Sequence, residues 1–124
     1  YKFVCENWEL VCNQVVDLGC GPGFTTDMLA KATEAKTVIG FDISDYFIEL
    51  ARKNFPNYKF MKADVTDLTG NEGFDMMYCR FLLSHLNNIH NLFNNWLSLL
   101  NPRGSVYIDE LEDILDATIR KHEA

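Results

Sequence analysis

Short apolar segments alternate along the chain with longer segments whose apolar residues recur at helical spacing. The short segments are rich in β-branched and aromatic residues and are bounded by turn-forming residues, which is typical of strands in a buried sheet. The predicted strands are 14–18, 37–42, 58–63, 74–79 and 105–109. Apolar positions spaced by three and four residues predict helices. The predicted helices are 1–13, 25–35, 44–55, 89–100 and 111–124.

Polar residues at the ends of these segments indicate how they begin and where they lie. Ser44 is a favourable N-cap for the helix after the second strand, and Thr25 or Thr26 is expected to cap the helix after the first. Lys59 and Lys62 lie within the third strand, and lysines in a strand favour an edge position, where they prevent unwanted pairing.

The alternation of strands and helices predicts an α/β domain with a mostly parallel sheet of about five strands and helices on both faces. Ligands of such sheets bind beyond the carboxyl ends of the strands, near the point where the strand order reverses. We therefore expect the functional residues to follow directly after the strands.

A length of 124 residues suits one domain. We interpret 1–124 as a single domain with an N-terminal helical segment (1–13), a core (14–110) and a C-terminal helix (111–124). The chain begins with Tyr rather than Met, which favours a fragment of a longer protein.

The formal net charge of −7 disfavours binding to nucleic acids or anionic membrane surfaces, because both attract lysine and arginine. No apolar run reaches the roughly 20 residues of a membrane span. The four cysteines form no C-x-x-C pair and have no histidines at zinc-ligand spacing, which indicates a reduced, cytoplasmic protein without a metal site. We expect a small-molecule partner and neither a nucleic-acid nor a membrane partner.

The first candidate for chemistry is the G-x-G-x-G sequence of Gly19–Gly23, which lies between the first strand and the following helix. Glycines there allow positive φ angles and a close approach of a ligand to the backbone. The helix behind the loop presents unpaired N–H groups. The pattern is typical of nucleotide loops, although a glycine-rich turn without a ligand is the alternative.

Two carboxylates follow the next strands. Asp42 ends the second strand, where an acidic residue of a dinucleotide-type fold accepts hydrogen bonds from ribose hydroxyls. Its structural alternative is a cap for the helix that starts near Ser44. Asp64 follows the third strand, and its alternative is an ordinary loop residue.

Together these segments resemble the class I S-adenosylmethionine-dependent methyltransferases, in particular the broad small-molecule methyltransferase group that includes quinone-biosynthesis enzymes. The resemblance rests on five segments that correspond to successive family motifs: 15–23, 38–43, 61–65, 74–80 and 99–104. Their joint spacing is far more specific than any one motif.

The resemblance implies a Rossmann-like three-layer sandwich with strand order 3-2-1-4-5. The family adds two strands after the fifth, the last one antiparallel, and we identify no candidate for either, so the chain is expected to be a truncated core. The fifth strand would then have an open edge, at which a homodimer could form. Arg103 stands where the family's L-x-P-G-G turn has its first glycine.

The same resemblance implies contacts with the cofactor S-adenosylmethionine. The backbone of the loop, in particular Gly19, Cys20, Gly21 and Gly23, would lie against the methionine and ribose groups. Asp17 would order this loop and reach the methionine ammonium through water. Asp42 would hold the ribose hydroxyls, and Ile43 would pack on the adenine.

The remaining implied contacts come from the third and fourth strands. The side chain of Asp64 would accept a hydrogen bond from the adenine amino group, with the Val65 backbone nearby. The carbonyl of Cys79 would face the methionine ammonium. Arg80 and Phe81 would border the site.

The implied function is methyl transfer to a small-molecule acceptor by in-line displacement. Because the sulfonium is already activated, alignment of donor and acceptor supplies most of what the protein must do, and no catalytic residue is assigned. His85 is a candidate general base if the acceptor must lose a proton, and a packing role is its alternative.

Two other functions remain open. An NAD-dependent oxidoreductase shares the loop and the ribose carboxylate, but Phe24 and Asp64 suit it poorly. A non-catalytic cofactor-binding or interaction domain is the second.

Overall fold

The computed structural model describes residues 13–68, 73–80, 89–110 and 115–120. The strands are β1 (Gln14–Leu18), β2 (Thr37–Asp42), β3 (Lys59–Lys62), β4 (Phe74–Arg80), β5 (Leu100–Glu110) and β6 (Leu115–Arg120). The helices are α2 (Phe24–Thr33), α3 (Asp45–Asn54) and α4 (Ile89–Leu99).

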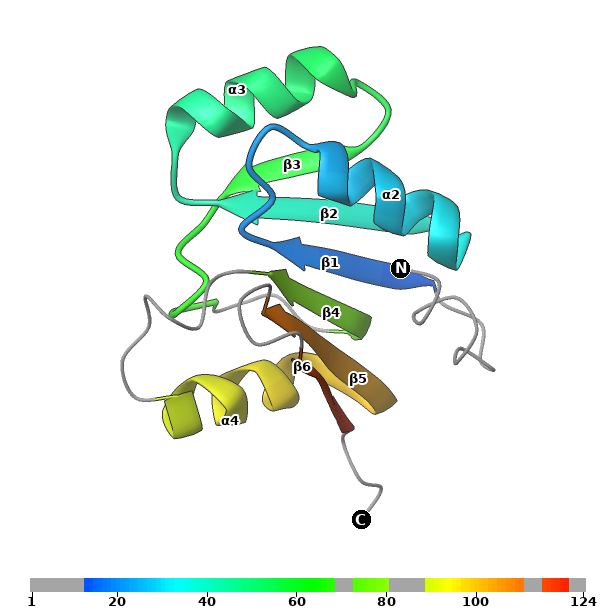
Figure 1. The fold of residues 1–124 in the computed structure, drawn as a ribbon, viewed down its shortest axis with the longest axis vertical. Coiled ribbons are helices and arrows are strands. Elements are labelled where there is room, and N and C mark those ends of the chain that lie inside the picture. The colour runs from blue at the N-terminus through cyan, green and yellow to red at the C-terminus, as the bar shows by residue number, and fades with distance from the viewer. Residues whose placement is uncertain (1–12, 69–72, 81–88, 111–114, 121–124) are drawn as a thin grey trace.

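All of these strands form one sheet in the order β3-β2-β1-β4-β5-β6. The pairs from β3 to β5 are parallel. The α/β class and the order 3-2-1-4-5 are therefore confirmed, and the helices lie on both faces of the sheet as predicted (Figure 1).

The centre of the sheet is β1, which pairs with β2 on one side and with β4 on the other. Its residues Val15, Val16 and Leu18 have no exposed surface. Leu18 is in register with Phe41 of β2 and with Cys79 of β4, so the three strands end at the same level. This alignment brings the carboxyl ends of β1, β2 and β4 to one edge of the domain.

A different helix set covers each face of the sheet. On one face, Trp96 and Leu92 of α4 pack in a cluster with Val16 and Met77. On the other face, Leu29 of α2 packs with residues of β1, β2 and β4. The helix α3 covers the same face as α2 through Ile48 and Ala51, which cluster with Cys20 and Phe60.

The strand β3 lies at the edge of the sheet, as its lysines predicted. Ala63 N–H donates to the carbonyl of Asp42, so the backbone groups of Ala63 point towards β2. Backbone groups alternate between the two edges of a strand, and those of Phe60, three residues earlier, therefore point to the open side. The guanidinium of Arg52 donates to the Phe60 carbonyl from Nη2 at 2.8 Å and from Nε at 3.2 Å. Arg52 therefore covers this edge against pairing with another strand.

The C-terminal helix predicted at 111–124 is wrong for its central part, because Leu115–Arg120 forms the strand β6. It pairs antiparallel with β5, from Ser105↔Arg120 to Glu110↔Leu115. The sequence of this segment also alternates apolar and polar residues, and such short segments suit either structure. Backbone groups of β5 that would otherwise lack partners favour the strand. The edge of β5 is therefore not open, and the predicted homodimer loses its physical basis.

The break predicted after the helix that precedes β5 is confirmed, since α4 ends at Leu99. The next residues form an irregularity in the β4–β5 pairing, in which the register shifts from Phe74↔Leu100 to Met76↔Ser105. Arg103 has a φ of 69° there. This left-handed conformation favours glycine, which explains why the family pattern has glycine at this position.

The predicted N-terminal helix lies outside the described residues. Interpretation of the whole chain as a single domain stays a prediction.

Gly40 of β2 lets the loop after β1 approach the sheet, and it provides a test of this packing. A Cβ atom at Gly40 would lie 2.7 Å from the Phe60 ring and 2.8 Å from Cys20 Cβ. We expect Gly40→Ala to lower the free energy of unfolding by about 1–3 kcal/mol, the usual cost of overpacking. Urea denaturation measures this loss, and an unchanged midpoint would contradict the close packing of β2 against the loop.

Candidate functional site

The loop after β1 needs glycine at three positions. Gly19, Gly21 and Gly23 have φ angles of 77°, 54° and 99°, which residues with a Cβ rarely adopt. The backbone N–H groups of Gly19 and Cys20 both donate to the Phe41 carbonyl, at 2.8 and 2.9 Å. The loop therefore turns back over the end of β2 instead of continuing away from the sheet.

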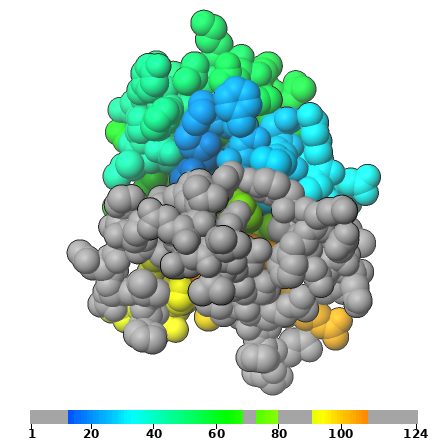
Figure 2. All heavy atoms as spheres, in the orientation of Figure 1, coloured from blue at the N-terminus to red at the C-terminus, as the bar shows by residue number. Residues whose placement is uncertain are grey.

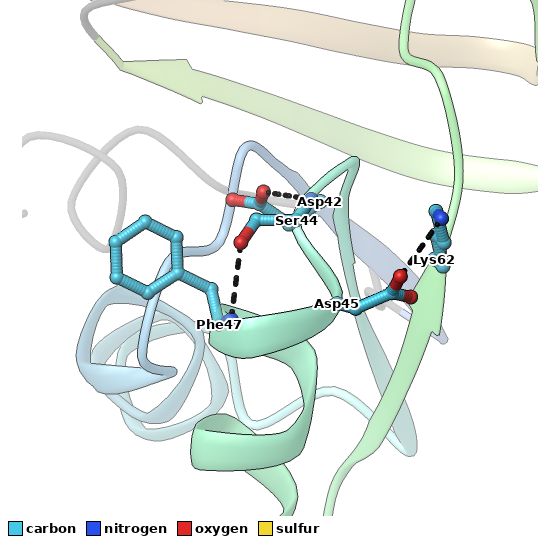
Figure 3. A network of polar contacts seen from close by, with 5 residues as sticks. All are labelled: Asp42, Ser44, Asp45, Phe47 and Lys62. Carbon is cyan, nitrogen blue, oxygen red and sulfur yellow. Dashed lines mark hydrogen bonds and ion pairs between the residues drawn. The ribbon is translucent and has the colours of Figure 1, made fainter.

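The carboxylate of Asp42 joins this loop to the start of α3. Its Oδ2 accepts from Gly21 N at 3.0 Å, and its Oδ1 accepts from Ser44 N at 2.9 Å. Ser44 is the N-cap of α3, as predicted, because its Oγ accepts from Phe47 N at 3.2 Å (Figure 3). Asp42 thus supports the helix start, although it is not the cap itself.

Asp17 lies in β1 and is completely buried. Its Oδ2 accepts a hydrogen bond from Thr26 Oγ1 at 2.8 Å. The prediction that Thr25 or Thr26 caps α2 is therefore wrong: the N-cap is Gly23, without a side-chain hydrogen bond. The Thr26 hydroxyl instead donates to one oxygen of a buried carboxylate, and this bond ties the helix behind the loop to β1.

Cys20 contributes its backbone to the site and its side chain to the core. It is 3% exposed and packs with residues of α3 and β3. Burial, and then the negative charges of Asp17 and Asp42, raise the pKa of its thiol to about 12. The thiol therefore stays protonated at neutral pH and is a poor nucleophile.

A nucleoside suits the surface around this loop. A Cβ atom at Gly21 would meet nothing within 4 Å, so its backbone faces open space. Ile43, next to the Asp42 carboxylate, exposes 64% of its surface. An apolar side chain beside a carboxylate offers contacts for a base and for hydroxyl groups. In Figure 2 the loop and the start of α2 (blue) reach the surface between α3 and the rest of α2.

The segment after β3 places Asp64 at the same edge of the sheet. Asp64 Oδ1 accepts from Thr66 N at 2.9 Å and from Thr66 Oγ1 at 2.6 Å. The Thr66 hydroxyl, and then its backbone N–H, hold the pKa of Asp64 below its usual value, so the exposed carboxylate is ionised at neutral pH. The Val65 carbonyl accepts from the indole Nε1 of Trp96 at 2.9 Å.

The strand β4 brings Cys79 next to the loop. Cys79 is buried and in register with Leu18, the last residue of β1. Arg80 ends β4, but its side chain, like Phe81 and His85, lies outside the described residues. The other residues predicted for the cofactor all lie in, or directly after, the carboxyl ends of β1 to β4.

Two residues that hold this site together were not identified from the sequence. Thr26 lies at the start of a helix, nine residues after Asp17, and this position predicted a helix cap instead of a bond to Asp17. Trp96 belongs to a helical stripe of apolar residues, and nothing in that stripe indicates that its N–H binds a loop far along the chain.

Within the described ranges, no group of three or more histidine, cysteine or acidic side chains could hold a metal ion. No helix in that part of the chain is long and apolar enough to cross a membrane.

Comparisons with known proteins agree with this geometry. Residues 15–104 match the family model described as a methyltransferase domain. The chain is 33% identical over 104 residues to trans-aconitate 2-methyltransferase of Escherichia coli, a match that covers 84% of this chain and 41% of the relative. The chain thus spans about two fifths of the length of the curated relatives it matches.

Solved structures give the same result. A S-adenosylmethionine-dependent methyltransferase from Mesorhizobium loti matches with a TM-score of 0.70 and 27% identity, over 79% of this chain and 47% of that one. The O-methyltransferase of a Brevibacillus brevis trans-AT polyketide synthase, solved with S-adenosyl-L-homocysteine, matches with a TM-score of 0.73 and 25% identity. That match covers 86% of this chain and 38% of the other.

The buried bond between Asp17 and Thr26 predicts a stability effect. Thr26→Val keeps the shape of the side chain but removes the donor to a buried carboxylate. We expect a loss of about 1–3 kcal/mol in the free energy of unfolding, measured by urea denaturation. Thr25→Val is the matched control, since it makes the same change at a half-buried position on the same turn. Equal effects of the two substitutions would contradict a specific role of the Thr26 hydroxyl.

Proposed function

Because the chain belongs to the methyltransferase domain family that its residues 15–104 match, we propose that it is the donor-binding core of an S-adenosylmethionine-dependent methyltransferase. The observation that carries the proposal is the Asp42 carboxylate, which links the glycine loop to α3 beside the exposed Ile43. The solved relative with S-adenosyl-L-homocysteine supports this choice of cofactor.

Each part of the cofactor would have its own group of residues. The ribose hydroxyls would donate to Asp42, whose carboxylate oxygens each accept only one backbone N–H among the described residues and can accept more. The adenine would pack on Ile43 and donate its amino group to Asp64. The loop from Gly19 to Gly23 and the carbonyl of Cys79 would hold the methionine part, with Arg80 and Phe81 at the border.

The protein's chemical task is then mainly one of alignment. When bound, the cofactor supplies a methyl group on a sulfonium, which is already activated for transfer. Residues of this chain would hold the donor rigidly at the edge of the sheet, and effective alignment supplies several kcal/mol of the barrier. The thiol of Cys20, with its high pKa, takes no part in this chemistry.

The acceptor that we propose is a small molecule. The curated relatives are named for a small organic acid, trans-aconitate. The net charge of −7 supports the absence of a nucleic-acid partner. We also propose a cytoplasmic location, which the pattern of the cysteines supports.

Titration calorimetry with S-adenosyl-L-homocysteine and with NAD tests the choice of cofactor. We expect binding of S-adenosyl-L-homocysteine and no binding of NAD, because Phe24 replaces the third glycine of the dinucleotide pattern. Binding of NAD alone would refute the proposal in favour of an oxidoreductase.

The role of Asp42 predicts a large loss of affinity. In Asp42→Ala, S-adenosyl-L-homocysteine should bind roughly 10- to 100-fold more weakly, or about 1.5–3 kcal/mol, the range for hydrogen bonds to a charged group. Asp45→Ala is the control, because it removes a nearby carboxylate whose exposed ion pair with Lys62 contributes little.

A second ligand separates the ribose contact from the support that Asp42 gives to the loop. The 2′,3′-dideoxy analogue of S-adenosyl-L-homocysteine lacks the hydroxyls, so wild-type protein should bind it weakly. Asp42→Ala should then cost this analogue much less affinity than it costs the parent ligand. Equal losses for both ligands would show that Asp42 acts only on the loop.

A further inference from the structure

The segment that follows β3 packs against the face of the sheet that α4 covers, and one side chain of α4 also donates a hydrogen bond to it. Trp96 of α4 is completely buried, and its Nε1 donates to the Val65 carbonyl at 2.9 Å. The two residues are 31 positions apart in the chain. Ala63 and Val65 also pack against the cluster that contains Trp96. In Figure 1 the segment runs from β3 along the carboxyl ends of the strands towards α4.

Local contacts make the segment a rigid turn. Asp67 N donates to the Asp64 carbonyl at 3.0 Å, and the two bonds from Thr66 fix the Asp64 side chain. Leu68, which is 1% exposed, anchors the end of the turn in the core. The Trp96 bond lies between these points, so the orientation of the turn relative to the sheet depends on it.

The turn leaves one carboxylate oxygen for a ligand. Both bonds from Thr66 go to Asp64 Oδ1, and no donor to Oδ2 is found among the described residues. Because Asp64 is exposed and ionised, Oδ2 can accept from a ligand amino group. Its position is set by Thr66 locally and by Trp96 through the backbone of Val65.

We propose that Trp96 is a positioning residue for adenine recognition, an inference that rests on the proposed function. The indole N–H holds the Val65 carbonyl and thereby aims Oδ2 of Asp64 at the adenine amino group. Trp96 itself lies in the core and has no exposed surface for contact with a ligand. Its effect is therefore selective for the 6-amino group and is small for the ribose and methionine parts of the cofactor.

The test measures binding of two ligands to Trp96→Phe in the full chain. One ligand is S-adenosyl-L-homocysteine, and the other is its analogue in which purine replaces adenine, so that only the 6-amino group is missing. We expect Trp96→Phe to weaken the first about 3- to 10-fold, the usual effect of one lost hydrogen bond, and to leave the second within about 2-fold. In an Asp64→Asn background, Trp96→Phe should have no further effect.

Phe93→Leu is the matched control. Phe93 lies on the same helix and packs on the same cluster, with its ring 5.9 Å from that of Trp96, but it donates no hydrogen bond to the turn. Its substitution should lower stability without changing the ratio of the two affinities. Equal weakening of both ligands by Trp96→Phe, or no weakening, would overturn the inference while the proposed function stands. Failure of the wild-type chain to bind S-adenosyl-L-homocysteine would overturn both.

A measurement on the intact indole covers the case in which Trp96→Phe does not fold. The chain has two tryptophans, so in Trp8→Phe the indole proton of Trp96 gives a single signal in NMR spectra. Coupling between the ligand and the Trp96 bond is reciprocal, so S-adenosyl-L-homocysteine should slow exchange of this proton with solvent. The purine analogue should slow it less, and equal slowing by the two ligands would contradict the inference.

Discussion

The site depends first on the hydrogen bonds of one carboxylate. Asp42 stands at the end of β2, and it receives the backbone N–H of Gly21 from one side and that of Ser44 from the other. Among the described residues, it is the hydrogen-bond acceptor that the glycine loop and the start of α3 share. Because each carboxylate oxygen can accept more than one hydrogen bond, the same group can hold the protein together and still bind hydroxyl groups.

The loop is positioned by contacts on every side. From β2 it receives the Phe41 carbonyl, and the absence of a side chain at Gly40 allows Cys20 to approach the sheet. The hydrogen bond from Thr26 to Asp17 ties α2 to β1 and so fixes both ends of the loop. This bond is buried and is therefore stronger than an exposed one. A loop with three glycines would otherwise be costly to order, and these contacts offset that cost.

The donor side and the opposite face of the sheet are connected through the turn after β3. The proposed adenine acceptor, Asp64, lies on this turn, and Trp96 of α4 holds the turn from the far side of the sheet. The face of the sheet that α4 covers thus contributes to the proposed ligand site through one partly buried hydrogen bond. At the end of the sheet away from β3, β6 pairs with β5, so the sheet continues beyond the five parallel strands.

Sequence patterns correctly predicted those features that depend on residues close together in the chain. The strand–loop–helix around Gly19–Gly23, the cap at Ser44 and the edge position of β3 follow from residues close together in the chain, and the structure confirms each. The successive motifs also identified the family by resemblance, and the strand order that this resemblance implied is the one that the structure shows.

Features that depend on residues far apart in the chain could be identified only in the folded protein. Residues 115–120 suit a helix or a strand equally by pattern, and the unpaired backbone of β5 decided for the strand. Thr26 could cap a helix by pattern, but its hydroxyl donates a hydrogen bond to the buried carboxyl group of Asp17 instead. The sequence pattern predicts Trp96 only as an apolar core residue. Its indole N–H donates to the Val65 carbonyl because the fold brings α4 next to the segment after β3. Buried polar groups must find partners wherever the fold places them, and a linear pattern does not contain those positions.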